Sequence, residues 1–477
     1  MLFLGLMSLL VSVPLFSHRL RPSTLNRVTC IVLVFSRVLA LNVFTLDTVN
    51  LFNNLFHMGP LQSYVDAFMF MCGAVMLIGF SPVRIYLFTS EYDAKNELTM
   101  IMLFIMIGQS MVISSIDLFS LFISLELQSF AVYVTCTVQR DFETATIAGL
   151  KYFMLGALSR AVILLGIAIL YYFTGTTQFE DVYALFKVMS ITDFQHPMIM
   201  GLSLILIGFL FKVARAPLHF WAPDVYNGVP TVMTMIVQTL PKISILVVVL
   251  QLLSFKSSAF TYILLYASLR SLVIGTVVGL SQYRIKRLLA YSSISHVGFM
   301  TLCLVLNDQA SISTFLFYLV QYTLTNICMF LCILGLCYSN RGRVNFDQIA
   351  QLKTQFKLHP LIGLSMIICL FSMAGVPPLI GFYGKMLVLA EAMEHGYVFI
   401  TVTGVIVSVI SAAYYLKIVK VLCFDTDGPY IDESPSRVTA FHSFAITVFT
   451  LIITCYMLMP EILLNVSKLL AISLIGI

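Results

Sequence analysis

The sequence FKVARAPLHFW, residues 211–221, ends a long apolar run that has the composition of a membrane-spanning helix. Within the same stretch stand Lys212, Arg215, Pro217 and His219. Charged side chains are rare at membrane depth, and a proline removes one backbone hydrogen bond from a helix. The stretch therefore predicts a membrane helix that is broken, with a basic side chain beside the break.

The rest of the chain indicates an integral membrane protein. Its 477 residues are 60% hydrophobic and only 10% charged, which leaves too little polar surface for a soluble protein of this size. Apolar runs recur along the whole length without a long polar segment between them, so we expect a single membrane domain over 1–477. The net charge of +5 belongs to the loops and does not indicate a nucleic-acid partner.

Sequence patterns for cofactor and metal chemistry are missing. There is no Walker loop, no G-x-G-x-x-G after a strand, and no zinc, haem or iron–sulfur spacing among the 10 cysteines. Cys328, Cys332 and Cys337 share one apolar run, and we interpret them as small core residues. No cofactor site and no metal site are expected in this chain.

About fourteen apolar segments are long enough to cross a membrane, since a span needs ~20 mostly apolar residues. The predicted spans are 1–16, 28–44, 61–80, 99–115, 117–138, 146–173, 197–220, 229–253, 259–281, 288–306, 311–338, 360–391, 396–424 and 437–465. The first span is short, and the basic residues that follow it favour a membrane helix over a cleaved signal. The expected fold class is all-α, a polytopic membrane protein.

The distribution of basic residues supports this count. Sixteen lysines and arginines are assigned to the odd-numbered connections, whereas only Lys187 and Lys256 belong to the even-numbered ones. The positive-inside rule requires such an alternation and places the basic side in the cytoplasm or the mitochondrial matrix. Because the number of spans is even, both termini are expected on the opposite side.

Four charged residues inside the predicted spans are the candidate functional residues: Glu126, Lys212, Lys242 and Lys385. A charge at the centre of a membrane helix costs about 2.5–3.5 kcal/mol unless it faces a partner or water. Glu126 and Lys242 lie too deep in their spans to reach the headgroups. Each lysine also lies near a potential helix breaker, namely Pro217, Pro241 and the pair Pro377–Pro378.

Lysine suits a proton relay because desolvation lowers its pKa, so that it can load and release a proton near neutral pH. Glu126 is the expected modulator of the charge on Lys212. Several polar residues between the lysines could hold a chain of water: Gln238, Thr239, Tyr322, Thr323, Asn326 and His296. For His296 a hydrogen-bonded core position is an equal alternative.

The remaining charges within or near apolar runs are interpreted more conservatively. Arg37, Arg160 and Arg270 are expected to reach the headgroups or to form local salt bridges. For Lys151 a structural and a functional role remain equally open.

A weak internal repeat connects two of the helix breakers. ARAP at 214–217 and AGVP at 374–377 share the form A-x-x-P, 160 residues apart. They lie in the seventh and twelfth predicted spans, which must cross the membrane in opposite directions. Inverted repeats with broken helices have this arrangement.

Taken together, the motifs resemble those of the antiporter-like membrane-arm subunits of respiratory complex I, most closely the subunit 2 type, which is called subunit N in bacteria. The resemblance runs from about residue 84 to 424 and is carried by DLFSLFISLELQSFAVYV, AGLKYFMLGALSRAVILLGIAILYYFTG, FKVARAPLHFWAPDVYNGVPT, YRIKRLLAYSSISHVGF and AGVPPLIGFYGK. The related subunit 4 type has glutamate where this chain has Lys385.

The resemblance implies a proton-translocating subunit of NADH:ubiquinone oxidoreductase that has no redox centre of its own. It assigns Glu126, Lys212, Lys242 and Lys385 to a buried relay driven by quinone reduction elsewhere in the complex. It also implies two inverted five-helix repeats, 99–253 and 259–424, with discontinuous helices 7 and 12. Three N-terminal helices in 1–80 and a C-terminal helix in 437–477 complete the expected domain.

The same resemblance implies that NADH, FMN, iron–sulfur clusters and ubiquinone bind to other subunits. The implied partners are membrane-arm subunits, including the subunit 4 and subunit 4L types, and lipids such as cardiolipin. The implied location is the mitochondrial inner membrane, with a bacterial plasma membrane as the alternative. Other readings are a subunit of a cation/proton antiporter, a plastid-type NDH complex, and a scaffold without transport.

Two arginines depart from the family pattern. Arg160 stands where the family usually has a small polar residue, so an unusual neighbour of helix 6 is expected. Arg215 either adds a second cation near Lys212 or points to the matrix-side loop.

Overall fold

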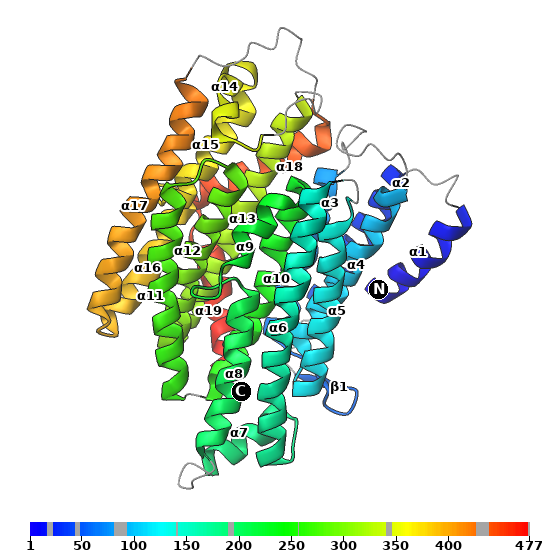
Figure 1. Cartoon of the computed structure of the whole chain (residues 1–477), viewed down its shortest axis with the longest axis vertical. Helices are drawn as coiled ribbons and strands as arrows, with labels where there is room; N and C mark the ends of the chain where they lie inside the picture. Colours follow the sequence, from blue (N-terminus) through cyan, green and yellow to red (C-terminus); the bar gives the residue numbers. More distant parts are fainter. Residues whose placement is uncertain are drawn as a thin grey trace. The chain divides into compact units, whose positions relative to one another are not determined.

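The computed structural model describes residues 1–16, 22–42, 48–80, 93–139, 142–188, 195–255, 257–339, 346–425 and 438–475. Nearly all of them are helical (Figure 1). The helices are α1 (Leu2–Phe16), α2 (Pro22–Asn42), α3 (Pro60–Phe80), α4 (Asp93–Ser114), α5 (Leu118–Thr137), α6 (Glu143–Thr174), α7 (Phe179–Val188), α8 (Gln195–Lys212), α9 (Trp221–Gly228), α10 (Thr231–Leu252), α11 (Ser258–Leu280), α12 (Ile285–Leu306), α13 (Gln309–Ser339), α14 (Gln355–Leu358), α15 (Pro360–Ala374), α16 (Ile380–Glu394), α17 (Val398–Cys423), α18 (Ala440–Cys455) and α19 (Glu461–Ile475).

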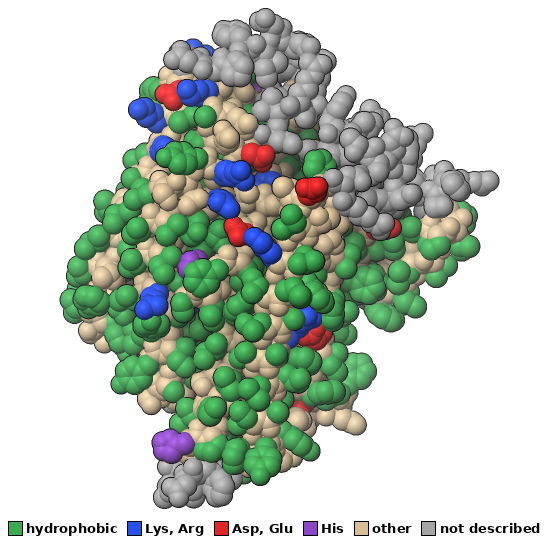
Figure 2. All heavy atoms as spheres, viewed as in Figure 1, with side chains coloured by type: hydrophobic (Ala, Val, Ile, Leu, Met, Phe, Trp, Pro, Cys, Tyr) green, Lys and Arg blue, Asp and Glu red, His purple; other side chains and the backbone are tan. Residues whose placement is uncertain are grey.

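The all-α polytopic membrane class is confirmed. Within the described ranges, 12 helices are long and apolar enough to cross a membrane, and the shorter helices α1 and α15 are also apolar. The face drawn in Figure 2 is covered mostly by hydrophobic side chains, as expected for a surface that meets lipid. The total of fourteen spans and the five-helix repeats remain predictions. Several loop cations behind the predicted orientation, including Arg84, Arg140 and Arg341, lie outside the described residues.

Most predicted spans begin and end within a few residues of the bounds of an observed helix. Where the bounds differ, the cause is local. Asp117 separates α4 from α5, because its carboxylate accepts the backbone N–H groups of Phe119 and Ser120 at 3.1 Å and caps α5. The predicted span 437–465 consists of α18, a 3₁₀ turn and α19, which continues to Ile475. A short hairpin, β1 (Val49–Leu51) with β2 (Phe56–Met58), and the helix α7 were not predicted.

The chain divides into two compact units. Unit 1 comprises Met1–Leu77, Tyr92–Trp221 and Leu240–Ile263, and unit 2 comprises Ile78–Glu91, Ala222–Thr239 and Leu264–Ile477. In unit 1, α6 packs along α8 and α5, and α5 also packs on α4. In unit 2, α13 is central and contacts α12, α15, α16, α18 and α19. The candidate residues Glu126, Lys212 and Lys242 belong to unit 1, and Lys385 belongs to unit 2.

Both predicted helix breaks are present, and their backbones match. α8 ends so that the Ala214 N–H donates to Phe211 O and the Arg215 N–H donates to Leu210 O. α15 ends in the same way, with Gly375 N–H to Ser372 O and Val376 N–H to Phe371 O. These paired bonds form the Schellman helix ending, and its left-handed residue is Ala214 (φ 62°) or Gly375 (φ 86°).

When the two helix ends are aligned by their hydrogen bonds, equivalent residues differ by one position from the alignment of the two A-x-x-P motifs. Ala214 corresponds to Gly375, so the offset is 161 (375 minus 214) and not the 160 of the A-x-x-P motifs. Pro217 therefore matches Pro378, and each of them follows a cis peptide bond. Pro241, the third potential helix breaker, does not interrupt its helix, because α10 runs through this proline.

Candidate functional site

The Glu126 carboxylate forms an ion pair with Arg160. Arg160 Nη1 lies 2.7 Å from Glu126 Oε2, and the two side chains retain only 12% and 19% of their exposure, respectively. A single hydrogen bond at this distance between two charged groups is strong. The second oxygen, Glu126 Oε1, is buried and accepts no hydrogen bond from the described residues. The expected local salt bridge of Arg160 is therefore confirmed, and Glu126 keeps one free acceptor.

Three aromatic rings surround the Arg160 guanidinium. Its central carbon lies 4.9 Å from the ring centre of Phe130, 5.4 Å from Tyr133 and 5.5 Å from Phe153. The rings come from both α5 and α6, which approach closely at Gly156, where a Cβ atom would overlap the Tyr133 hydroxyl. Ring faces attract cations, so the cage holds Arg160 in position beside Glu126.

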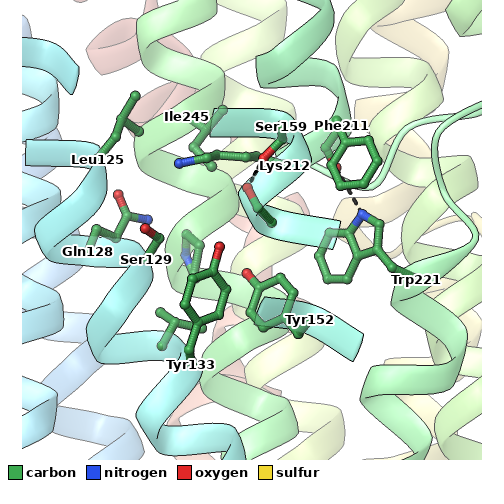
Figure 3. Close-up of a pocket in the computed structure, with 13 residues that line it drawn as sticks. Leu125, Gln128, Ser129, Tyr133, Tyr152, Ser159, Phe211, Lys212, Trp221 and Ile245 are labelled. Carbon is green, nitrogen blue, oxygen red and sulfur yellow. Dashed lines mark hydrogen bonds between the residues drawn. The ribbon is translucent and has the colours of Figure 1, made fainter. Parts of the chain in front are cut away.

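Lys212 is the last residue of α8 and lines a small cavity in unit 1 (Figure 3). The cavity has a volume of about 20 Å³, room for about one water molecule. In Figure 3 the Lys212 amine points towards α5, and Tyr133 and Tyr152 lie at the same pocket. Trp221 closes one wall by donating its indole N–H to Phe211 O at 3.0 Å.

The charges of Glu126 and Arg160 both act on Lys212. Among the described residues, however, the ion pair of Glu126 is made with Arg160 and not with Lys212. From the sequence, Glu126 was expected to modulate the charge on Lys212. The observed group has two cations near one carboxylate.

Lys242 is buried in the part of α10 that belongs to unit 1. Its neighbours Pro241 and Ile245 line the Lys212 cavity, so the same turn of α10 borders that cavity. Ser244 Oγ donates to Gln128 Oε1 of α5 at 3.3 Å and connects the two helices. Unit 1 therefore contains three of the four candidate residues, of which Lys212 lines the cavity and Lys242 lies in the turn of α10 that borders it.

Lys385 lies at a second polar position, in unit 2. Its amine donates to Ala374 O at 2.9 Å, a carbonyl at the interrupted end of α15. The amine also lies 5.8 Å from the centre of the Phe299 ring. Lys385 is buried and lines a cavity of about 600 Å³ between α15, α16 and α17, whose walls are mostly apolar. The break thus supplies a hydrogen-bond acceptor for the buried lysine.

The other polar residues named from the sequence have partners within unit 2. Both ring nitrogens of His296 meet tyrosine hydroxyls, Nδ1 with Tyr318 at 2.8 Å and Nε2 with Tyr415 at 3.3 Å. Asn326 donates to the Tyr322 hydroxyl at 3.4 Å. The direct contacts of His296 are thus those of a hydrogen-bonded core residue. Its partners Tyr318 and Tyr415 were not identified from the sequence.

The structure buries Arg215 and leaves both readings of it as predictions. Arg215 is buried to 1% exposure, and its three guanidinium nitrogens have no hydrogen-bond partner among the described residues. Lys151 and Arg270 are exposed, Arg270 over the Tyr266 ring, and Arg37 contacts Met71 Sδ at 3.2 Å.

Two buried features were not recognised in the sequence. Asp66 of α3 is buried, and its Oδ1 has no hydrogen-bond partner in the described part of the chain. The sulfur atoms of Cys328, Cys332 and Cys369 lie within 4.8 Å of one another, so Cys369 and not Cys337 joins the first two. A contact between α13 and α15 creates this group, and sequence spacing could not reveal it.

Comparison with known proteins places this arrangement in a family. Residues 115–411 match the family described as NADH:quinone oxidoreductase/Mrp antiporter, TM. NADH-ubiquinone oxidoreductase chain 2 of Rhizopus oryzae is 45% identical over 451 residues, which cover 89% of this chain and 86% of that protein. NADH-quinone oxidoreductase subunit N of Paramagnetospirillum magneticum is 38% identical, with 76% of each chain covered.

Solved structures have the same fold. A chain of respiratory complex I from Thermus thermophilus is 26% identical with a TM-score of 0.77, and 98% of this chain and 99% of that chain are covered. A chain of the Mrp complex from Dietzia is 18% identical with a TM-score of 0.84, covering 99% and 96%, and shows the likeness of fold alone. Since the family match spans more than half of the chain and the curated relatives cover most of it, this chain belongs to the NADH:quinone oxidoreductase/Mrp antiporter transmembrane family.

Proposed function

We propose that this chain is the subunit 2 (subunit N) component of a proton-translocating NADH:quinone oxidoreductase. The identity to chain 2 and subunit N proteins over most of both lengths supports this assignment. The observation that carries the transport function is the group of Glu126, Arg160 and Lys212 beside a water-sized cavity at the end of a broken helix. Buried charges at interrupted helices are the usual site of ion movement in membrane transporters.

The proposed mechanism uses proton loading and release at buried lysines. Lys212 takes up a proton while a carboxylate stabilises its positive charge, and releases it to water when that carboxylate moves away. Lys242, whose turn borders the same cavity, and Lys385, at the second break, are the further relay residues. Glu126 is the carboxylate that responds to the conformational change. Quinone reduction in other subunits supplies the energy.

The chain acts in the enzyme as a subunit of an NADH:ubiquinone reductase. NADH, FMN, iron–sulfur clusters and ubiquinone are assigned to other subunits of the complex. The partners proposed for this chain are its membrane-arm neighbours, including the subunit 4 and 4L types, together with lipids such as cardiolipin.

A mitochondrial inner membrane is the proposed location. The relatives from Rhizopus oryzae and Marchantia polymorpha, both eukaryotes, are named as ubiquinone oxidoreductase chains and are 45% and 35% identical to this chain. Bacterial relatives named subunit N keep a bacterial plasma membrane as the alternative. In either case the chain is a multi-pass membrane protein.

A cation/proton antiporter is the second candidate function, favoured by the likeness of fold to the Mrp complex. A native gel separates the two candidates. If the proposal is correct, the tagged chain comigrates with a large complex that oxidises NADH and pumps protons in vesicles. A tagged chain found only in a particle without NADH-oxidising activity would favour the antiporter or plastid-type alternative.

A further inference from the structure

Arg160 and Lys212 are two cations that share one nearby carboxylate. Arg160 holds Glu126 Oε2 at 2.7 Å, and the charges of both Glu126 and Arg160 act on Lys212. Glu126 Oε1 is buried and accepts no hydrogen bond from the described residues. The carboxylate thus has a second binding position available while its first is occupied by arginine.

The two cations differ in what they can do with a proton. A guanidinium does not lose its proton in a protein, whereas a desolvated lysine amine can. Arg160 is also held by three rings at 4.9, 5.4 and 5.5 Å, so its charge stays in one place. Lys212 borders a cavity with room for about one water, which gives its proton a place to go. The positive charge of Arg160 is therefore permanent, whereas that of Lys212 depends on its protonation.

We propose that Arg160 is the competing partner of Glu126: it holds the carboxylate while Lys212 is without its proton, and it gives up the carboxylate when Lys212 is charged. This proposal rests on the proposed function. In one direction, Lys212 passes its proton to the cavity water as Glu126 returns to Arg160. In the other, Lys212 takes a proton from water as Glu126 moves to its amine. Arg160 is a positioning residue here, since it acts through Glu126 and carries no proton.

The competition between Arg160 and Lys212 has a consequence for the protonation state of Glu126. Because the carboxylate always has a cationic partner, it stays ionised through the cycle and moves without taking up a proton. A purely structural ion pair would also keep Glu126 ionised, but it would not couple the position of the carboxylate to turnover. The effect of Arg160 should then depend entirely on the presence of Glu126.

The test compares four variants in the assembled complex: Arg160→Gln, Arg160→Lys, Glu126→Gln and the double variant Arg160→Gln/Glu126→Gln. We expect Arg160→Gln to lower NADH-driven proton pumping by about tenfold, the factor that corresponds to losing one hydrogen bond to a charged group. Arg160→Lys keeps the charge and should retain most of the pumping. The double variant should pump as Glu126→Gln does alone, with no added loss.

Arg270→Gln is the matched control. Arg270 is also an arginine of an apolar helix with an aromatic partner, the Tyr266 ring at 4.3 Å, but it is exposed on α11. It should pump at the wild-type rate. A loss in Arg270→Gln equal to that in Arg160→Gln would show that removing any intramembrane arginine disturbs the complex, and would overturn the proposal.

Infrared difference spectra of the wild-type complex, with Glu126→Gln as the reference, give a measurement that does not depend on folding of the arginine variant. The Glu126 signal should shift within the carboxylate region during turnover, without a protonated carboxyl band. A protonated Glu126 in either state, or a signal that does not change with turnover, overturns the proposal. So does assembled Arg160→Gln that pumps normally. Normal pumping by Glu126→Gln would instead remove Glu126 from the proposed function itself.

Discussion

At the residue scale, function depends on which of the buried charged side chains can gain or lose a proton. Glu126, Lys212, Lys242 and Lys385 all have restricted access to solvent. Charges in such surroundings are costly, and they are retained where a change of charge is useful. The two simplest tests remove the charge or make it permanent.

Glu126→Gln removes the charge and keeps the shape. We expect the complex to assemble and its pumping-coupled turnover to fall, because Lys212 loses the carboxylate that stabilises its protonated state. Glu126→Asp should retain part of the activity. Quinone reductase rate and proton pumping, each divided by the amount of assembled complex, measure the effect. Wild-type turnover in Glu126→Gln would contradict a role for this carboxylate.

Lys→Arg at Lys212 or Lys242 makes the charge permanent. A relay needs proton release, so arginine should damage turnover about as much as alanine does. Lys385→Arg should behave likewise if this residue gates proton exit. A scaffold would instead tolerate arginine better than alanine. The same rates per assembled complex decide between the two, and full activity in all three arginine variants would leave the lysines as structural charges.

The four candidate residues were accessible from sequence, because a charge in a long apolar run stands out and the motifs around it resemble a known family. The partner of Glu126 could not be identified from the sequence. Arg160 is 34 residues away on another helix, and whether two side chains meet depends on the rotation of α5 against α6. α5 and α6 meet at Gly156, where a Cβ atom would overlap the Tyr133 hydroxyl, and no single-helix pattern contains that contact.

At the element scale, the matching ends of α8 and α15 show how two different sequences form one backbone shape. Both ends use a left-handed residue, Ala214 in one and Gly375 in the other. Sequence indicated that both helices break, because of their prolines. It could not give the register, since the hydrogen bonds and not the A-x-x-P letters define equivalent positions. Proline alone does not identify a break, since α10 runs through Pro241.

Gly375→Ala tests this ending. The left-handed conformation costs an alanine about 1–2 kcal/mol, and its Cβ would lie 3.1 Å from Lys385 Cδ. We expect a lower melting temperature of the assembled complex and reduced pumping, because Lys385 is displaced. Ala214→Gly is the control at the equivalent position, where the relief of strain and the added chain entropy should nearly cancel. An unchanged melting temperature in Gly375→Ala would argue against the observed backbone conformation.

At the scale of the whole molecule, membrane orientation is the property that sequence predicts and that contacts within the chain do not determine. The positive-inside distribution places the connection containing Lys353 in the matrix or cytoplasm and both termini on the other side. The all-α class and the broken helices were predictable from apolar length and proline. The division into two units was not, because α10 contributes residues to both.

An epitope tag measures the orientation directly. A tag beside Lys353 should bind antibody only in vesicles that expose the matrix or cytoplasmic face. Tags on either terminus should bind only in vesicles of the opposite orientation. Binding of both kinds of tag in the same sealed vesicles would contradict the odd number of spans predicted between Lys353 and each terminus.

The size of the cavity beside Lys212 has a consequence for ion selectivity. A space of about 20 Å³ holds about one water, whereas a sodium ion needs several oxygen ligands or its hydration shell, and the neighbouring amine would repel it. A proton can pass through one water and an amine without any such coordination shell. Replacing sodium by choline in sealed vesicles should therefore leave turnover and pumping unchanged, and a proportional loss with falling sodium would show that this step admits a larger cation.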